Sequence, residues 1–266
     1  MLIHPTAIVD KSVKLDNNVS IGAYSVISGD VEIGAGTIIK DHATLYGPLR
    51  MGTENVIHPG AVVGNVSQDL KYKGEESIVI IGNNNSIREC VTIHQGTEAN
   101  QGRTIIGSNN LLMAYTHIAH DCTLGNNIII ANGTQLAGHI NINDFAYIGG
   151  LVGVHQFVTI GSYCFVGFLS RVNKDVPPFT TVEGNPSRER CINVEGLKRK
   201  GFSQEEIVLL KKAFMILFGK EKTLAGKEKV LTSAEYAGSD KVKMLLEFVI
   251  ESSRGKNGRA LEAYRK

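Results

Sequence analysis

The chain has 266 residues, of which 42% are hydrophobic and 20% charged, a composition typical of a soluble globular protein. Its start lacks the basic and apolar regions of a signal peptide, and no apolar run approaches the ~20 residues that a membrane-spanning helix needs. The four cysteines show no CxxC spacing, so the sequence suggests neither a zinc knuckle nor a disulfide framework. We therefore expect a cytoplasmic protein with reduced thiols and no transmembrane segment.

The net charge of +2 is unevenly distributed along the chain. Residues 186–266 contain 18 Lys and Arg against 11 Asp and Glu, whereas residues 1–185 contain 10 against 15. A basic C-terminal part would attract an acidic partner or an anionic substrate, although a Lys-rich helix is as often just a solvated surface. We expect no nucleic-acid partner.

Aliphatic residues recur at every sixth position over most of the first 185 residues. This period fits neither a helix nor an alternating strand. It is typical of hexapeptide repeats, in which three short strands make one coil of about 18 residues and the periodic side chain points inward. We predict a mainly β fold, a left-handed parallel β-helix over residues 1–185. With a shift of one residue before Ile106, the periodic residues are Ile3, Val9, Leu15, Ile21, Ile27, Ile33, Ile39, Leu45, Met51, Ile57, Val63, Ile81, Ile87, Ile93, Ile106, Leu112, Ile118, Leu124, Ile130, Leu136, Ile142, Ile148, Val154, Ile160, Val166 and Val172.

Small residues have fixed places in this repeat. The residue after the periodic aliphatic one is often Gly, as at Gly34 and Gly107, and we expect it to supply the unusual dihedral angles of the corners. Cys122 and Cys164 fall on inward positions, so we predict core residues rather than nucleophiles.

Two segments interrupt the repeat. Residues 65–77 replace about two hexapeptides, and residues 96–103 introduce the one-residue shift. Loops that leave a regular scaffold often carry functional residues. We therefore expect both segments to lie near a functional site.

Three motifs should stack at one corner of the β-helix. Residue i lies above residue i−18, about 4.8 Å away, which places Gly138 over His120 and His139 over Asp121. The motifs HIAHDC, LAGHIN and GVHQFV then occupy the same corner in three successive coils. The polar residues that converge there are His117, His120, Asp121, Gly138, His139, His155 and Gln156, with His94 near the coil below. Exposed corners are polar in any solenoid, but the other corners carry Asn, Asp and Gly instead of a histidine ladder.

Two chemistries fit this corner. Neutral imidazoles could bind a divalent metal, as in β-helical carbonic anhydrases, which hold zinc on three histidines. Alternatively, one imidazole is a general base whose tautomer is fixed by a neighbouring acid. Asp121, next to His120, and Gly138, with a backbone N–H free to face an oxyanion, favour the second. No Ser or Cys in these motifs resembles an activated nucleophile, so direct transfer is expected.

A helical region should follow the repeat, which ends near Val172 and the motif KDVPPF. Ser203 and Glu206 form a capping box before an apolar stripe, and a second stripe follows in residues 239–255. We predict a C-terminal α-helical domain over residues 186–266 that caps the solenoid. The two stripes are Ile207, Leu210, Phe214 and Leu217, and Val242, Leu245, Leu246 and Val249.

Over essentially its whole length the chain resembles the UDP-N-acetylglucosamine O-acyltransferases of the first step of lipid A synthesis. The motifs that carry the resemblance are HPTAIV, SQDLKY, IREC, VTIH, QGT, HIAHDC, LAGH, VHQF, DVPPF, EGN and NVEGLKRKGFS. QDLKY, HIAHDC and EGLKR are the most specific of these. Hexapeptides alone would indicate only the superfamily.

The resemblance implies transfer of a 3-hydroxyacyl chain from acyl carrier protein to the 3-position of UDP-N-acetylglucosamine. It implies no cofactor and no metal, and a homotrimer with sites between subunits. His120 would be the general base, Asp121 would orient it and the Gly138 N–H would stabilise the oxyanion. The implied substrate contacts are Asp69, Lys71, His94, His117, His139, His155, Gln156, Phe168, Asn193, Glu195 and Arg199.

One departure from the family pattern bears on specificity. Phe168 stands where long-chain members have a glycine at the floor of the acyl groove, which predicts a medium-length acyl preference. The sequence does not decide whether the acceptor carries a 3-hydroxyl or a 3-amino group. The rival functions are the related UDP-3-O-acylglucosamine N-acyltransferase, a zinc carbonic-anhydrase-like enzyme and a non-catalytic scaffold.

Overall fold

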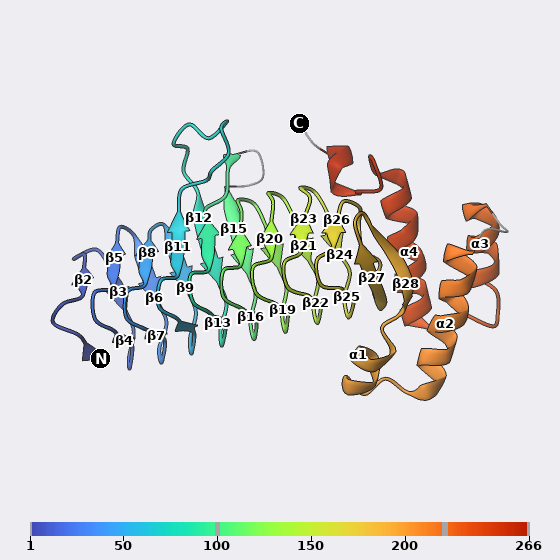
Figure 1. Ribbon diagram of the computed structural model, residues 1–266, viewed down its shortest axis with the longest axis horizontal. Coiled ribbons are helices and arrows are strands. Elements are labelled where there is room, and N and C mark those ends of the chain that lie inside the picture. Colours follow the sequence, from blue (N-terminus) through green and yellow to red (C-terminus); the bar gives the residue numbers. More distant parts are fainter. Residues whose placement is uncertain (1, 99–101, 220–222, 265–266) are drawn as a thin grey trace.

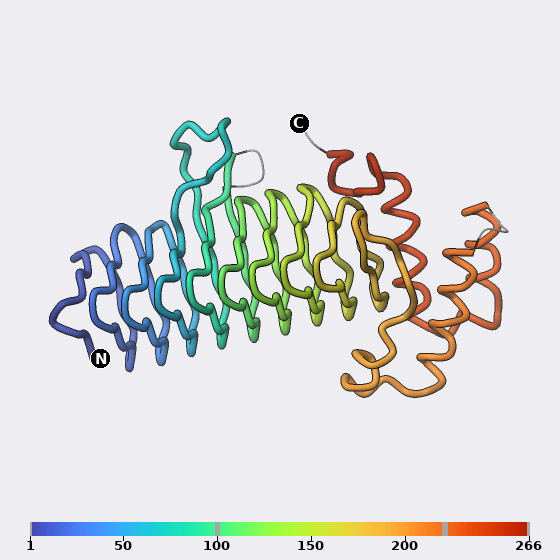
Figure 2. Tube along the Cα trace, in the orientation of Figure 1, coloured from blue at the N-terminus to red at the C-terminus, as the bar shows by residue number. Residues whose placement is uncertain are grey.

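The computed structural model describes residues 2–98, 102–219 and 223–264. It shows a parallel β-helix followed by helices at its C-terminal end (Figure 1). The coils stack along one axis from the blue N-terminus, and the segment around residue 70 projects from one side of the stack (Figure 2). The predicted fold class is confirmed.

Each coil contributes one strand to each of three sheets, which are parallel except for the last pair of strands in the first sheet. The first sheet contains, in spatial order, β1 (Leu2–Ile3), β4 (Ser20–Ile21), β7 (Ile38–Ile39), β10 (Val56–Ile57), β13 (Ser86–Ile87), β16 (Leu111–Leu112), β19 (Ile129–Ile130), β22 (Tyr147–Ile148), β25 (Phe165–Val166), β27 (Thr180–Gly184) and β28 (Ser187–Ile192). The second contains β2 (Ile8–Val9), β5 (Val26–Ser28), β8 (Thr44–Tyr46), β11 (Val62–Asn65), β14 (Thr92–His94), β17 (His117–Ile118), β20 (Gln135–Leu136), β23 (Gly153–Val154) and β26 (Arg171–Val172). The third contains β24 (Thr159–Ile160), β21 (Asn141–Ile142), β18 (Thr123–Leu124), β15 (Arg103–Ile106), β12 (Ile78–Ile81), β9 (Leu49–Met51), β6 (Val31–Ile33) and β3 (Lys14–Leu15).

The strand register follows the hexapeptide period. His117 pairs with Gln135 and Gln135 with Gly153, a step of one regular coil each time. Across the second interrupting segment the step is longer, because Thr92 pairs with His117. The periodic aliphatic side chains from Ile21 onward form the buried core, together with Cys122 and Cys164, as predicted.

The predicted role of the corner glycines holds at Gly64, with φ of 86°, but is wrong at Gly34 and Gly107, which do not adopt the left-handed conformation. In most described corners the left-handed residue lies two positions later, as at Asp121. A Cβ on Gly34 would lie 2.7 Å from the backbone carbon of Gly52 in the next coil. These glycines are therefore required by the close approach of successive coils.

The helices cover the C-terminal end of the solenoid. They are α1 (Val194–Arg199), α2 (Gln204–Phe218), α3 (Leu224–Leu231), α4 (Asp240–Arg254) and the 3-10 helix η2 (Leu261–Tyr264). The capping box of Ser203 and Glu206 is present. Both predicted stripes pack into one cluster, in which Val249 is only partly buried. Among the described residues, no helix is long and apolar enough to cross a membrane.

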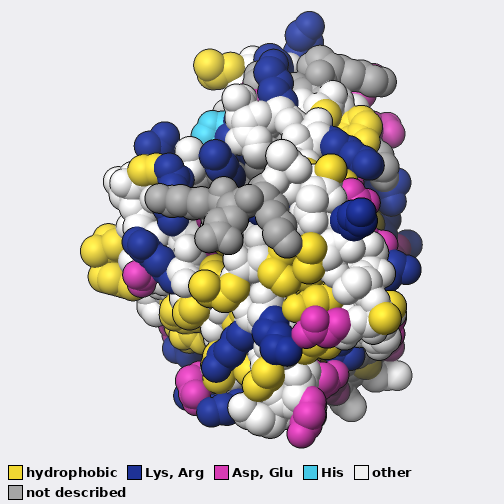
Figure 3. All heavy atoms as spheres, turned by 90° about the vertical axis from the view of Figure 1, so that its right-hand side faces the viewer, with side chains coloured by type: hydrophobic (Ala, Val, Ile, Leu, Met, Phe, Trp, Pro, Cys, Tyr) yellow, Lys and Arg dark blue, Asp and Glu magenta, His cyan; other side chains and the backbone are white. Residues whose placement is uncertain are grey.

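The β27–β28 hairpin joins the two parts of the chain. β27 pairs with β25 of the solenoid, and β28 packs against α2. A domain boundary between residues 185 and 186 would fall inside this hairpin and stays a prediction. Lys and Arg side chains are spread over this end of the molecule among apolar and acidic ones (Figure 3).

Candidate active site

The predicted histidine corner lies between β17 and β18. The amide of His139 donates to the carbonyl of His120 (3.1 Å), and the amide of Phe157 donates to that of Gly138 (3.2 Å). Asp121 and His139 occupy equivalent left-handed positions, with φ of 62° and 61°. The three motifs therefore occupy the same corner in three successive coils, as the spacing predicts.

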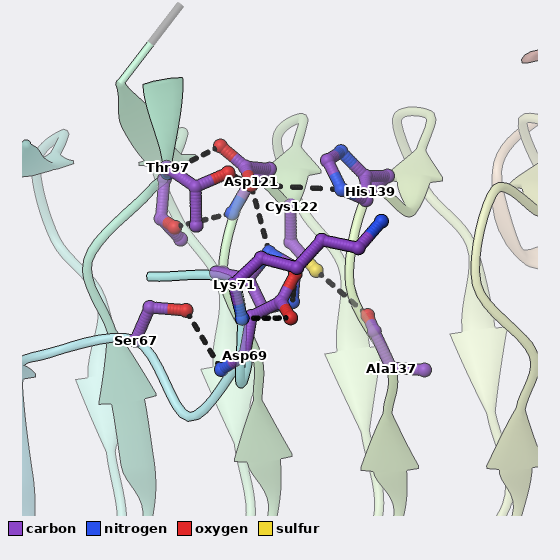
Figure 4. A network of polar contacts seen from close by, with 10 residues as sticks. Ser67, Asp69, Lys71, Thr97, Asp121, Cys122, Ala137 and His139 are labelled. Carbon is purple, nitrogen blue, oxygen red and sulfur yellow. Dashed lines mark hydrogen bonds and ion pairs between the residues drawn. The ribbon is translucent and has the colours of Figure 1, made fainter. Parts of the chain in front are cut away.

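His120 and Asp121 form a hydrogen-bonded pair at this corner. Nδ1 of His120 lies 2.7 Å from Oδ2 of Asp121, whose side chain is completely buried. Thr97 holds the same carboxylate with its amide (2.8 Å) and its hydroxyl (2.6 Å) (Figure 4). An ionised carboxylate only accepts hydrogen bonds, so His120 donates from Nδ1 and keeps the lone pair of Nε2. This arrangement provides a proton acceptor with a fixed tautomer.

Gly138 makes room for the imidazole of His120. A Cβ at this position would lie 2.5 Å from Cε1 and 2.6 Å from Nε2 of His120. Among the described residues, none accepts a hydrogen bond from the Gly138 amide. Position 138 thus requires glycine because a side chain would clash with His120. As expected, the amide of Gly138 is left without an acceptor among the described residues.

The first interrupting segment reaches over the corner. Oδ2 of Asp69 lies 4.0 Å from Nε2 of His120. The Asp69 carboxylate accepts the amide of Lys71 (3.0 Å), and the Asp69 amide donates to the hydroxyl of Ser67 (3.1 Å) (Figure 4). The segment therefore adds a carboxylate beside the free nitrogen of the candidate base.

A second pair of histidines lies on the sheet beside the corner. The rings of His94 and His117 meet edge to face at 5.2 Å, and Nδ1 of His117 contacts the Thr92 hydroxyl at 2.7 Å. Burial, with smaller contributions from His94 and His120, lowers the pKa of His117 to about 4. His117 is therefore neutral and a weak proton acceptor near neutral pH, which leaves His120 as the better candidate base.

Two pockets flank the corner. One, of about 800 Å³, is lined by Asp69, Lys71, His139 and Gln156, among others. The second, of about 380 Å³, is lined by His117, Ala137, Gly153, His155 and Arg171. Of the predicted residues, His139 and Gln156 line the first pocket and His117 and His155 the second, while His94 contacts His117.

The remaining predicted contacts lie elsewhere on the chain. Phe168 is on the corner between β25 and β26, not on the histidine corner, and its side chain is 63% exposed. Asn193 caps α1 through the Gly196 amide, and Glu195 and Arg199 are on this helix. Figure 1 shows α1 on the opposite side of the solenoid from the projecting segment. One chain does not bring these residues to His120.

The sequence and the structure both resemble those of known acyltransferases. The family model "Udp N-acetylglucosamine O-acyltransferase; Domain 2" matches residues 175–256, and the bacterial transferase hexapeptide model matches residues 12–47 and 103–138. LpxA from Acinetobacter baumannii is 43% identical with a TM-score of 0.90, over 93% of this chain and 96% of that one. The acyltransferase from Francisella novicida is 38% identical over 99% and 98% (TM-score 0.90), and that from Arabidopsis 35% over 94% and 96% (TM-score 0.86).

The chain belongs to the UDP-N-acetylglucosamine O-acyltransferase family. Two further observations bear on the site. The match to the family's domain 2 model ends at residue 256, so η2 lies beyond it. The ligand atoms of His120, Asp121 and His139 lie within 4.8 Å of one another, a spacing that could hold a metal ion.

Some site residues were missing from the sequence prediction. Thr97 lies in the second interrupting segment, where the break in the repeat was the signal; residues 99–101 of that segment lie outside the described residues. Leu261 and Tyr264 line the larger pocket, and no motif pointed to them. They reach the pocket only through the packing of the C-terminal end on the solenoid.

Proposed function

We propose that this chain transfers a 3-hydroxyacyl group from acyl carrier protein to the 3-position of UDP-N-acetylglucosamine, the first step of lipid A synthesis. Family membership supports the reaction class. The observation that carries the mechanism is the His120–Asp121 pair, because a buried carboxylate held by Thr97 leaves Nε2 of His120 as the proton acceptor beside the pocket. No cofactor is required in this reaction.

In this mechanism Nε2 of His120 takes the proton of the sugar hydroxyl while the hydroxyl oxygen attacks the thioester carbonyl carbon. The Gly138 amide donates to the oxyanion of the tetrahedral intermediate. The carbon–sulfur bond then breaks, and the proton passes from His120 to the departing thiolate of the carrier. Asp121 orients His120 and stabilises its charged form, and Asp69 adds a second negative charge at 4.0 Å from Nε2.

The two buried cysteines of the core are poor candidates for the nucleophile of a covalent acyl-enzyme. Cys122 lies directly behind Asp121 but is completely buried, and this burial raises the pKa of its thiol to about 12. Burial raises the pKa of the Cys164 thiol as well. Since the thiolate is the nucleophile, neither cysteine is poised for attack at neutral pH.

A homotrimer would supply the rest of the site. Phe168, Asn193, Glu195 and Arg199 lie away from His120 within one chain, so a neighbouring subunit would bring its copies to this corner. The Phe168 ring would then close the acyl groove and favour medium-length chains. Lys and Arg side chains at the helical end would attract the acidic carrier protein.

The cluster of His120, Asp121 and His139 leaves a zinc enzyme as the second candidate. Against it, both oxygens of Asp121 already accept hydrogen bonds from Thr97, and Oδ2 also faces His120. Metal analysis of the purified protein tests this reading. Stoichiometric zinc together with loss of activity on chelation would support it.

The first experiment compares wild type with His120→Ala, using 3-hydroxyacyl carrier proteins of several chain lengths and UDP-N-acetylglucosamine. Removal of a general base typically lowers the rate by about 10²–10⁴-fold, and we expect such a loss in kcat at every length. Wild type should prefer a medium length. Equal turnover of long and medium donors would contradict the role of Phe168, and an active His120→Ala protein would contradict the mechanism.

The acceptor needs one further comparison. If wild type fails with every donor, the assay is repeated with the 3-amino sugar nucleotide. Transfer to this acceptor would keep the mechanism and change the acceptor. Transfer to UDP-3-O-acylglucosamine instead would indicate the related N-acyltransferase, and no transfer to any of them would indicate the scaffold.

A further inference from the structure

Residues 256–264, here called the C-terminal arm, fold back from the end of α4 onto the exit of the solenoid. The amide of Asp175 donates to the carbonyl of Gly258 (2.9 Å), and the amide of Ala260 donates to Oδ2 of Asp175 (2.8 Å). In Figure 1 the red end of the chain lies on the side of the solenoid from which the segment of residues 65–77 also projects. The arm is thus fixed beside the candidate site.

A buried ion pair holds the arm in this position. Arg259 and Glu262 are only 6% and 7% exposed, and their charged groups lie 2.5 Å apart. Arg259 also donates to the carbonyl of Asn173 (2.6 Å), which is 86 residues earlier in the chain. Burial of two charges is costly unless both are paired and hydrogen-bonded, so these contacts define one position for the arm.

This position brings η2 to the larger pocket. Leu261 and Tyr264 line one end of the pocket, whose other lining residues include His139 and Gln156 of the histidine corner. The Tyr264 side chain is 79% exposed, so its ring is accessible to a ligand. The pocket therefore extends from the catalytic cluster to the arm.

The first interrupting segment adds two cations to the same pocket. Lys71 and Lys73 both line it. The carboxylates of Asp69 and Glu75 accept the backbone amides of these two lysines, whereas neither lysine ammonium group forms an ion pair with a carboxylate in the described part of the chain. A phosphate group of a bound substrate would be a suitable partner for them.

We infer that the C-terminal arm is a substrate-binding wall of the site. Arg259 is a positioning residue that holds Leu261 and Tyr264 against the phosphate-bearing part of a substrate whose reacting end lies at His120. The inference rests on the proposed function, in which two substrates carry such a group: the diphosphate of the sugar nucleotide and the phosphodiester of the carrier's phosphopantetheine arm. Both combine an anion with an extended polar chain, and kinetics can distinguish them.

The test measures kcat and KM for wild type, Tyr264→Ala and Arg259→Gln. Each substrate is varied in turn: UDP-N-acetylglucosamine, the 3-hydroxyacyl carrier protein, and the 3-hydroxyacyl phosphopantetheine without the protein. We expect KM for one substrate to rise about 5–20-fold while kcat stays within about twofold, the pattern of lost uniform binding. A rise for the sugar nucleotide identifies its diphosphate, and a rise for both donors identifies the phosphopantetheine arm.

Tyr24→Ala is the control, because Tyr24 is also an exposed tyrosine (61%, against 79% for Tyr264) near the other end of the solenoid. If Arg259→Gln unfolds, Tyr264→Ala alone decides the question, since this exposed ring contributes little to the core. Unchanged KM values for all three substrates in Tyr264→Ala would overturn the inference. If wild type shows no transfer, the proposed function fails separately, and calorimetric binding of UDP-N-acetylglucosamine and acyl phosphopantetheine to wild type and Tyr264→Ala still tests the arm.

Discussion

At the scale of single residues, the site depends on two residues adjacent in the sequence, whose side chains meet because of the backbone conformation at the corner. His120 and Asp121 are adjacent, and the left-handed conformation of Asp121 is a strained one for a residue with a side chain. The Asp121 amide donates to the Thr104 hydroxyl (2.9 Å), and Thr97 binds its carboxylate. Two threonines thus stabilise the conformation that aims Asp121 at His120.

Gly138→Ala should inactivate the enzyme without unfolding it. The added methyl group would lie within 3 Å of the His120 ring, so the imidazole has to move, whereas the backbone of Gly138 suits alanine. Misplacement of a catalytic group by about 1 Å can cost about 10²-fold in rate, and we expect a loss of this size in kcat. Acyl-transfer kinetics and a thermal unfolding curve measure the two effects.

Gly238→Ala is the control for this substitution, because a Cβ at Gly238 meets no atom within 4 Å. It should retain the activity of wild type. Normal kcat in Gly138→Ala would show that the ring of His120 is not restricted to this position.

At the scale of elements, the repeat made most of the fold predictable. A fixed coil length converts a sequence spacing into a stacked position, which placed His139 over Asp121 and Gly138 over His120. The same rule does not hold across an insertion, so the position of Thr97, which lies within one, could not be derived. It also says nothing about the C-terminal arm, because no period relates Arg259 to Asn173.

The contact between arm and solenoid should depend on pH. Burial is the main cause that raises the pKa of Asp175 to about 6, while the amides of Thr159 and Ala260, the Ser252 hydroxyl and Arg259 oppose the rise. Between about pH 4 and 6 the folded state then binds more protons than the unfolded state, so stability falls as pH rises through this window. The contribution lost is up to about 3 kcal/mol.

Asp175→Asn removes this titration. In denaturant unfolding at a series of pH values, wild type should lose stability relative to Asp175→Asn as the pH rises from 4 to 6. Parallel curves for the two proteins would show that Asp175 keeps an ordinary pKa. The asparagine side chain also has one acceptor oxygen fewer than the carboxylate of Asp175, but the cost of losing it does not vary with pH.

At the scale of the whole molecule, the chain separates two groups of residues that one reaction would need together. His120 is on the corner between β17 and β18, whereas Arg199 is the last residue of α1 on the far side of the solenoid (Figure 1). The sequence predicted both groups through family motifs, but no spacing rule indicated that they lie apart. In the proposed homotrimer, one chain would offer its His120 corner to the α1 of the next, which would bring the two groups together.

This arrangement predicts complementation between two inactive variants. Under the proposed function, His120→Ala would lack the base and Arg199→Ala would lack a substrate contact, so each variant alone should have little activity. When both chains are unfolded together, mixed and refolded, about one quarter of the sites in random trimers combine an intact His120 with an intact Arg199 from the neighbour. Activity should rise to about that fraction of wild type, as measured by acyl transfer. If both residues instead act within one chain, no mixed trimer contains an intact site, and the refolded mixture would stay as inactive as its parents.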